Sequence, residues 1–265
     1  MAKILIPIPD RDFDPTEVAV PWKVWRDLGH RIVFATPEGR KATADPRMVT
    51  GKGLGVLAGV LRADANGRAA YAAVQESIEF RHPIAWHDIA MVEVDALFLP
   101  GGHAPGMKAY LESGEVQAKV AAMFAADRPV GAICHGVLVA ARSRGEGGRS
   151  VLHGRKTTAL PRKMEMTAWW LTRWWLADYY RTYPQTVEDE VRGELARPED
   201  FLPGPAGTKR DDPAHPELGF TVRDGMYLSA RWPGDAHRFA SEFSQLIADA
   251  RAAPVPAQPA VGGPG

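Results

Sequence analysis

The chain contains a single cysteine, and its neighbours predict a reactive position. Cys134 follows the apolar run Val130–Ile133 and precedes His135 and the apolar segment Val137–Ala141. This pattern predicts a short buried strand, a sharp turn and a helix, with the cysteine on the turn, where its side chain is presented above the sheet. The sequence therefore predicts a cysteine nucleophile with a histidine beside it as a base.

The residues around this turn support that interpretation. A sharp strand-to-helix turn tolerates only small residues two positions away, and Ala132 and Gly136 meet the requirement. The free N–H groups and the dipole at a helix N-terminus favour thiolate over thiol, so we expect a lowered pKa for Cys134. The alternative is a buried structural cysteine, because free cysteines are among the most buried residues.

Composition excludes several classes of protein. The 265 residues include 32 basic and 32 acidic side chains, and zero net charge argues against nucleic-acid or membrane-surface binding. One cysteine leaves no intrachain disulfide and no multi-cysteine metal cluster, which suits a reducing cytosol. No apolar stretch reaches the ~20 residues that span a bilayer, and no signal peptide is evident. We expect a soluble, cytoplasmic protein that acts on a small molecule.

Apolar runs alternate with helical patterns along most of the chain. Buried parallel strands are predicted at Lys3–Ile8, Arg31–Thr36, Asp95–Pro100 and Val130–Ile133. Helices are predicted at Thr16–Leu28, at Glu115–Ala126 and in a final segment that ends near Ala250. This alternation predicts an α/β fold with an open, mostly parallel sheet flanked by helices.

The second half of the chain is less regular. A further strand is predicted at Lys156–Leu160, a loop at 188–210, and a hairpin from Phe220 to Ala230. The aromatic segment Trp169–Tyr183 is predicted to be helical. A role in the core and in a subunit interface is favoured there over a wall of a substrate site.

One domain accounts for nearly the whole chain. We expect a single α/β domain over residues 1–251, with an insertion at about 40–87 that packs over one edge of the sheet as a small cap near the site. Residues 252–265 are rich in Pro, Ala and Gly, and a disordered tail is predicted there.

Further candidate site residues follow the first and third predicted strands. Glu17 lies in the first turn of the first helix, where open α/β sheets bind ligands, although an acid there could serve only to stabilise the helix. Gly101 and Gly102 directly follow a strand, and their N–H groups could bind a developing oxyanion next to His103.

Neither a metal nor a nucleotide is expected. His82, His87 and Asp88 do not have the spacing of a metal site, so a surface or capping role is favoured for them. The glycines between residues 51 and 59 lack the spacing of a phosphate-binding loop. We expect no cofactor.

Together these segments resemble the ThiJ/PfpI superfamily, which has a flavodoxin-like fold of the class I glutamine-amidotransferase type. The resemblance spans most of residues 3–250, and its inserted segment and "GGH" resemble the glutathione-independent glyoxalase and chaperone-like branch. Intracellular protease, protein deglycase and isonitrile hydratase activities also occur on this fold. The matching pieces are Glu17, "ATPEG" (35–39), "FLPGGH" (98–103), "AICHG" (132–136) and "DGMYLSARWPGDA" (224–236).

The resemblance implies roles for the candidate residues. Cys134 would be the nucleophile, with a protonated Glu17 close to the sulfur, His135 as the base, and the N–H groups of Gly102 and His135 around the oxyanion. Relatives orient the histidine with a carboxylate after the next strand, and by position this would be Glu165. The chain departs from the family here, because Arg162 stands where some relatives have Asp.

The activity implied is the conversion of methylglyoxal or a similar carbonyl compound to a 2-hydroxy acid, by a cofactor-free lyase or hydrolase. One alternative is hydration or hydrolysis of a C–N bond in a larger substrate, in a pocket lined by Trp169–Tyr183. Another is a non-enzymatic redox-sensing or holdase-like stress protein, in which Cys134 is reversibly oxidised. The resemblance and the excess of aromatic residues also imply a homodimer.

Overall fold

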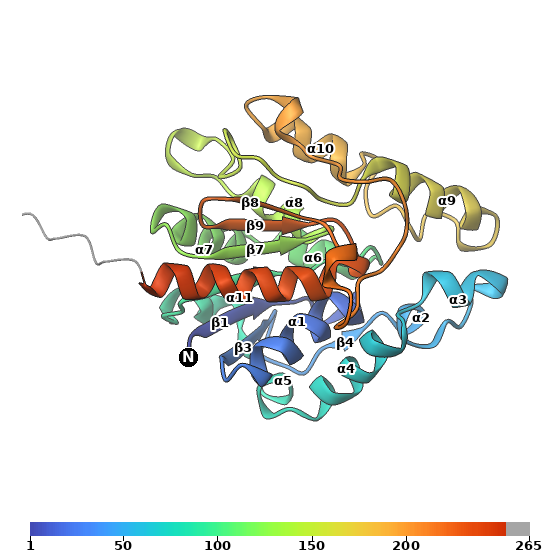
Figure 1. Ribbon diagram of the computed structural model, residues 1–265, viewed down its shortest axis with the longest axis horizontal. Helices are drawn as coiled ribbons and strands as arrows, with labels where there is room; N and C mark the ends of the chain where they lie inside the picture. The colour runs from blue at the N-terminus through green and yellow to red at the C-terminus, as the bar shows by residue number, and fades with distance from the viewer. Residues whose placement is uncertain (253–265) are drawn as a thin grey trace, which may run out of the picture.

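A computed structural model describes residues 1–252, and they are organised around a central sheet of seven strands (Figure 1). All strands of this sheet are parallel except β8, which pairs antiparallel with β9 in the predicted hairpin. The predicted open, mostly parallel α/β sheet is therefore confirmed. Across the sheet the order is β5 (Ile84–Ala85), β3 (Arg31–Thr36), β1 (Lys3–Pro7), β6 (Ala96–Leu99), β7 (Val130–Ile133), β9 (Tyr227–Ala230) and β8 (Thr221–Asp224).

Two groups of helices flank the sheet (Figure 1). The first group, in which α1 packs against both other helices, is α1 (Pro15–Asp27), α4 (Ala65–Glu76) and α11 (Ala236–Ala252). The second group, packed around α8, is α6 (Met107–Leu111), α7 (Gly114–Ala125), α8 (Gly136–Arg142) and α10 (Val187–Glu194). The remaining elements are β2 (Arg11–Phe13), which pairs with β4 (Thr43–Ala44), and α2 (Pro46–Thr50), α3 (Ala58–Leu61), α5 (Ile78–Arg81) and α9 (Arg162–Leu176).

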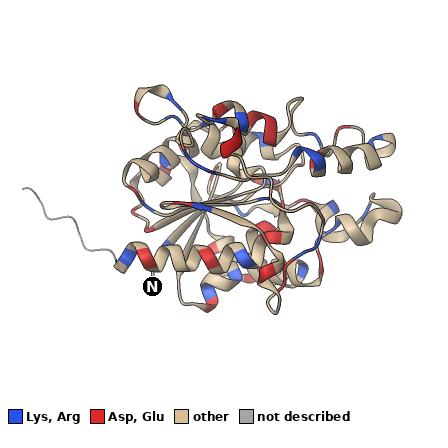
Figure 2. Cartoon of the chain, turned by 45° about the horizontal axis from the view of Figure 1, so that its top comes forward, with Lys and Arg blue, Asp and Glu red and all other residues tan. Residues whose placement is uncertain are grey.

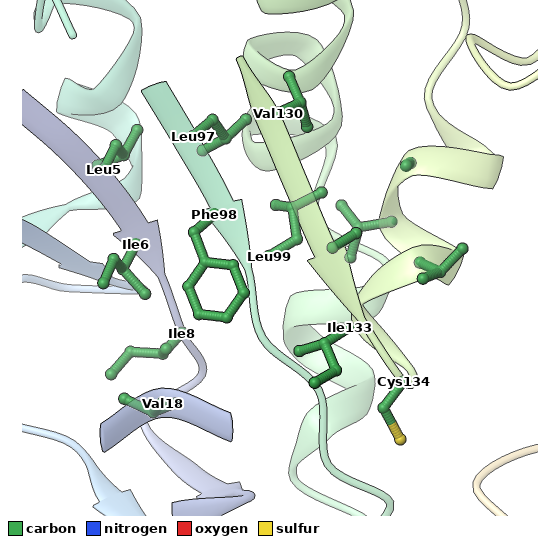
Figure 3. Packing of buried hydrophobic residues seen from close by; sticks show 14 of the residues in the cluster. Leu5, Ile6, Ile8, Val18, Leu97, Phe98, Leu99, Val130, Ile133 and Cys134 are labelled. Carbon is green, nitrogen blue, oxygen red and sulfur yellow. The ribbon is translucent and has the colours of Figure 1, made fainter. Parts of the chain in front are cut away.

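The central strands are buried on both faces, as their unbroken apolar sequences predict. Every residue of β6 and β7 is buried, and Leu5, Phe98 and Val130 belong to one continuous core (Figure 3). Cys134 follows at the carboxyl end of β7, where its sulfur projects beyond the packed strands (Figure 3). The sheet therefore presents the thiol at its carboxyl edge.

The prediction of a strand at Lys156–Leu160 is wrong. Thr157 forms only an isolated bridge with Phe201. The Thr158 N–H donates to the Ser229 hydroxyl at 3.0 Å, and the Thr157 hydroxyl lies 3.2 Å from the same oxygen. Side-chain hydrogen bonds thus dock this segment against β9 where the apolar sequence pattern suggested a strand ladder.

Two other predictions are corrected. The aromatic helix α9 ends at Leu176, because Ala177 takes a left-handed conformation with a φ of 50°, so the tyrosines that follow lie in an irregular segment. The predicted loop at 188–210 contains α10, which is capped by Thr186 and buries two apolar residues one helical turn apart. This segment has so few apolar residues that a helical periodicity was not evident from its sequence.

The later part of the segment 40–87 packs within the helix and sheet layers of the domain, and its earlier part lies near the site. Helix α4 packs on α1, and β5 extends the sheet next to β3. The earlier part, with α2 and α3, lies near α9, where the Trp175 indole N–H donates to the Gly53 carbonyl at 3.0 Å. The tail predicted at 252–265 lies outside the described residues, except that Ala252 ends α11.

Acidic and basic residues are both spread over the elements of the chain, and three acidic residues gather in the first turn of α10 (Figure 2). Among the described residues, no helix combines the length and the apolar composition that crossing a bilayer requires.

The turn at Cys134 depends on Gly136, the first residue of α8. A Cβ atom at this position would overlap the Leu99 carbonyl oxygen and would lie 2.7 Å from the Pro100 oxygen. The turns that follow β6 and β7 therefore touch through their backbones, which leaves room only for a hydrogen atom.

We predict that Gly136→Ala lowers the free energy of unfolding by about 1–3 kcal/mol, because the added methyl group must displace backbone. Gly193→Ala is the matched control, since a Cβ there meets no atom within 4 Å. Alanine at this helical site should be neutral or stabilising by up to ~1 kcal/mol. Urea denaturation measures both, and equal stability of the two variants would contradict the packing argument.

Candidate functional site

Cys134 lines a cavity of about 650 Å³. Its φ is 57°, a left-handed conformation that is uncommon for residues other than glycine. The Cys134 N–H is fixed by the Ala230 carbonyl at 3.1 Å, and only 5% of the residue is exposed. Strained backbone of this kind is concentrated at functional sites.

Glu17 is held directly beside this turn. The Gly101 N–H donates to Glu17 Oε2 at 2.8 Å, and a Cβ on Gly101 would lie only 2.7 Å from that oxygen. Glu17 is fully buried, and its Oε1 has no hydrogen-bond partner among the described residues. Since the Gly101 N–H already binds Glu17, it is not available to an oxyanion, contrary to the sequence-based expectation. Within residues 1–252, the Gly102 and His135 N–H groups bind no backbone carbonyl.

Asp14 positions Glu17 at the start of α1. The Asp14 side chain caps this helix by accepting hydrogen bonds from the Thr16 and Glu17 N–H groups at 2.8 and 3.0 Å. Burial raises the pKa of Asp14 to about 6. Burial and the nearby Asp14 carboxylate raise the pKa of Glu17 well above its usual range, so Glu17 is protonated at neutral pH.

The predicted lowering of the Cys134 pKa is wrong. Burial raises the pKa of the Cys134 thiol well above its ordinary value, and the negative charges of Glu17 and Asp14 raise it further. The free-energy penalty of removing the thiolate from water is larger here than the stabilisation that the helix N-terminus provides. Cys134 and Glu17 therefore both hold their protons at neutral pH, so neither is charged.

His135 has one defined tautomer. The Thr182 hydroxyl donates its only hydrogen to the His103 carbonyl at 2.8 Å, so it must accept from His135 Nε2, 3.2 Å away. Burial lowers the pKa of His135 to about 3, which leaves the ring neutral with a single N–H. The other nitrogen, Nδ1, is thus unprotonated and lies 3.4 Å from Cys134 Sγ, ready to accept the thiol proton.

Glu165 does not contact His135. Its Oε2 accepts the Val187 N–H at 3.0 Å, and its side chain lines the same cavity as Cys134. Burial raises the pKa of Glu165 to about 7. The orienting contact that the resemblance assigned to this carboxylate is made in the structure by the Thr182 hydroxyl, which the sequence did not indicate.

His103 lies in the wall of the cavity. Its ring stacks on Tyr180 at 4.4 Å between ring centres and meets the edge of Tyr179 at 4.9 Å. Burial lowers the pKa of His103 to about 4, so the ring is neutral, and its Nε2 has no hydrogen-bond partner among the described residues.

The aromatic segment divides between the site and the surface. Tyr180 lines the cavity, whereas Trp170 is 53% and Trp174 is 80% exposed on α9. The prediction that the aromatic segment lies in the core of the chain is therefore wrong for these two tryptophans.

Most of the cavity wall is apolar and comes from segments outside the sheet. The segment 40–87 contributes Met48, Val60 and Leu61, and α9 contributes Met164 and Leu171. Within residues 1–252, no three His, Cys, Asp or Glu side chains are grouped so as to hold a metal ion.

Four residues at the site were not predicted. Asp14 could have been found from the pattern Asp-Pro-x-Glu, which is typical of a helix N-terminus. Trp232 lies in the segment 224–236, which was compared with the family as one piece without singling out this residue. Thr182 and Arg210 lie in irregular segments whose local sequence gives no signal for their positions.

We predict that Glu17→Gln lowers the apparent pKa of the Cys134 thiol, because glutamine cannot ionise, whereas a Glu17 carboxylate formed at alkaline pH opposes ionisation of the thiol. In the wild type, alkylation by iodoacetamide should keep accelerating up to pH 9 and above, without a plateau near neutrality. Glu165→Gln is the control: Glu165 lines the cavity but has no part in the pKa shift of Cys134. A wild-type plateau near pH 7 would contradict the burial argument.

Comparison with known proteins agrees with this geometry. Residues 8–205 match the family described as ThiJ/PfpI family-like. A deglycase of Pyrococcus abyssi is 38% identical over 166 residues, which are 62% of this chain and 69% of that protein. An uncharacterised protein of Schizosaccharomyces pombe is 28% identical over 121 residues, 45% of this chain and 44% of its own length.

A solved structure supports the fold independently. The crystal structure of glyoxalase III from Candida albicans superimposes with a TM-score of 0.67 at 17% identity, and the match covers 92% of this chain and 96% of that chain. The strand order, the cysteine turn and the match over residues 8–205 together show that this chain belongs to the ThiJ/PfpI-like family.

Proposed function

We propose that the protein is a cysteine-dependent enzyme that converts small reactive carbonyl compounds, such as methylglyoxal, to 2-hydroxy acids. One observation carries this proposal: Cys134 lines the cavity, with its Sγ 3.4 Å from the unprotonated Nδ1 of His135 and beside the buried carboxylic acid of Glu17. The similarity to a deglycase and to glyoxalase III supports it.

The first step is addition of the thiol to the aldehyde. The sulfur bonds to the carbonyl carbon while the thiol proton passes to His135 Nδ1 and then to the carbonyl oxygen, giving a hemithioacetal. The low pKa of His135 keeps the imidazolium short-lived, so the proton moves on at once. The Gly102 and His135 N–H groups can stabilise the negative charge that develops on the oxygen.

The second step moves hydrogen between the two carbon atoms. Glu17 donates its proton to the ketone oxygen while His135 takes the proton from the former aldehyde carbon, which gives an enediol. His135 then returns its proton to the adjacent carbon and the Glu17 carboxylate takes the remaining hydroxyl proton, which turns the enediol into a thioester. Water then cleaves the thioester, releases the 2-hydroxy acid and restores the Cys134 thiol. The net change is the addition of one water molecule to the dicarbonyl compound.

The size of the cavity supports a second candidate. Its volume of about 650 Å³ lies within the ~300–1,000 Å³ of pockets for drug-sized ligands, far larger than a three-carbon dicarbonyl compound fills. The same nucleophile could therefore hydrate or hydrolyse a C–N bond in a larger substrate. The raised pKa of Cys134 disfavours the redox-sensor alternative, because oxidation proceeds through the thiolate.

We expect the wild-type protein to form lactate from methylglyoxal without glutathione, and Cys134→Ser to lose this activity, since the chain has no other thiol. Lactate is measured enzymatically after stopping the reaction. Circular dichroism shows whether the variant is folded. No turnover by the wild type, with Cys134 still alkylated, would overturn the carbonyl proposal and favour the larger substrate.

A second prediction concerns the tautomer of His135. Thr182→Val removes the acceptor of the His135 Nε2–H, so Nδ1 is no longer reliably unprotonated, and we expect kcat to fall about 10–100-fold with KM little changed. Thr167→Val is the control, because Thr167 lines the cavity but has no hydrogen bond to His135. Equal activity of the two variants would show that Thr182 has no positioning role.

A further inference from the structure

Several polar groups around the cavity lack partners. Five side chains that line it each have a buried polar atom without a hydrogen-bond partner among the described residues. They are Glu17 Oε1, His103 Nε2, Tyr180 OH, Arg210 Nη1 and Trp232 Nε1. Leaving such a group unpaired inside a protein is unfavourable, and most buried polar atoms are therefore satisfied. A molecule bound in this one cavity can supply the missing partners.

Four of these groups fall into two sets, and the fifth, Tyr180, stacks on the His103 ring. Glu17 contacts the turn next to the nucleophile, and His103 follows directly after Gly101 and Gly102, so both belong to the proposed reaction centre. Arg210 and Trp232 come from the other half of the chain and lie together, with the guanidinium 5.0 Å from the centre of the Trp232 ring. The second set has no role in the proposed reaction.

Arg210 is a cation without an ionic partner in the described residues. No carboxylate lies within ion-pair distance of it, and its one hydrogen bond is a long contact of 3.5 Å from Nη2 to the Arg62 carbonyl. Its charge nevertheless reaches the reaction centre, since it lowers the pKa of Asp14, the cap of α1.

Trp232 is held in place by its neighbours. The adjacent Arg231 forms a fully buried, two-pronged ion pair with Asp235, with N–O distances of 2.9 and 2.8 Å. Asp235 also accepts the Phe220 N–H at 2.9 Å, which ties the turn to the edge hairpin. The indole, 9% exposed, thus sits on a rigid turn with its N–H unpaired.

We propose that Arg210 and Trp232 form a carboxylate-binding subsite in the cavity wall, so that the substrate is a carbonyl compound that also carries a carboxylate. This rests on the proposed function. Both side chains can only donate hydrogen bonds, and a partly desolvated guanidinium selects an anionic acceptor with oxygen atoms. The apolar residues that line the same cavity, among them Leu61, Met164 and Leu171, suit the hydrocarbon part of such a substrate.

A carboxylate fits better than a phosphate. Only one arginine is present in the subsite, and the Asp14 carboxylate, with a pKa of about 6, is mostly ionised at neutral pH. Its negative charge reduces the attraction for a dianion more than for a monoanion.

Calorimetry with unreactive ligands tests the subsite separately from the reaction. The probes are 4-phenylbutyrate and its primary amide, which have the same shape but differ in charge and contain no aldehyde. We expect the wild type to bind the acid about tenfold or more tightly than the amide, and Arg210→Gln to lose this preference. The bound acid should also slow alkylation of Cys134, which places it in the same cavity.

Two more variants keep the test decisive. Trp232→Phe retains the ring but removes the N–H, and should weaken binding of the acid about 3–10-fold. Arg62→Gln is the matched control, because Arg210 contacts only the Arg62 backbone and the Arg62 side chain does not line the cavity. Arg210→Lys, which keeps the charge, should retain part of the preference and serves if Arg210→Gln does not fold.

Equal binding of acid and amide, binding of neither, or a preference that survives in Arg210→Gln would overturn the subsite. Loss of the preference in Arg62→Gln would also do so, because it would reveal a diffuse charge effect. None of these outcomes depends on turnover. Loss of the subsite with intact methylglyoxal activity would leave the proposed function standing, and carboxylate selectivity without turnover would reject only the reaction.

Discussion

Contact between two backbone turns is the constraint on which the site depends. The turn after β6 and the turn after β7 approach so closely that Gly136 has no space for a Cβ next to the Leu99 carbonyl. Gly101 is confined in the same way, since a Cβ there would lie 2.8 Å from the His135 nitrogen. This contact forces Cys134 into its left-handed conformation and brings Glu17 to its side through the Gly101 N–H. Three segments distant in sequence thereby meet next to one sulfur atom.

Burial then determines the chemistry at this point. The same desolvation that raises the pKa values of Cys134 and Glu17 lowers those of His135 and His103, so each group is held in its neutral form. A site of this kind works by passing a proton along prearranged hydrogen bonds, while no group is charged in advance. The orientation supplied by the Thr182 hydroxyl therefore matters more than the basicity of His135.

The sequence predicted the parts of the structure that depend on local pattern. Unbroken apolar runs marked the parallel strands, and small residues around Cys134 marked its turn, because both are local requirements. The prediction of a strand at Lys156–Leu160 was wrong, because hydrogen bonds from Thr157 and Thr158 to the Ser229 hydroxyl take the place of backbone pairing between strands. The predicted direction of the pKa shift of Cys134 was wrong, because the burial that raises this pKa depends on the whole fold. Thr182 was missed, because only tertiary folding brings it to His135.

The origin of the cavity walls has an evolutionary consequence. Cys134 and His135 stand on the turn that ends β7, whereas much of the wall comes from segments 46–61, 160–171 and 203–210. Substitutions or changes of length in these segments alter the shape and polarity of the cavity without disturbing the packed strands. Selection can therefore act on what the protein recognises almost independently of how it reacts, so that one reaction centre can serve a succession of different substrates.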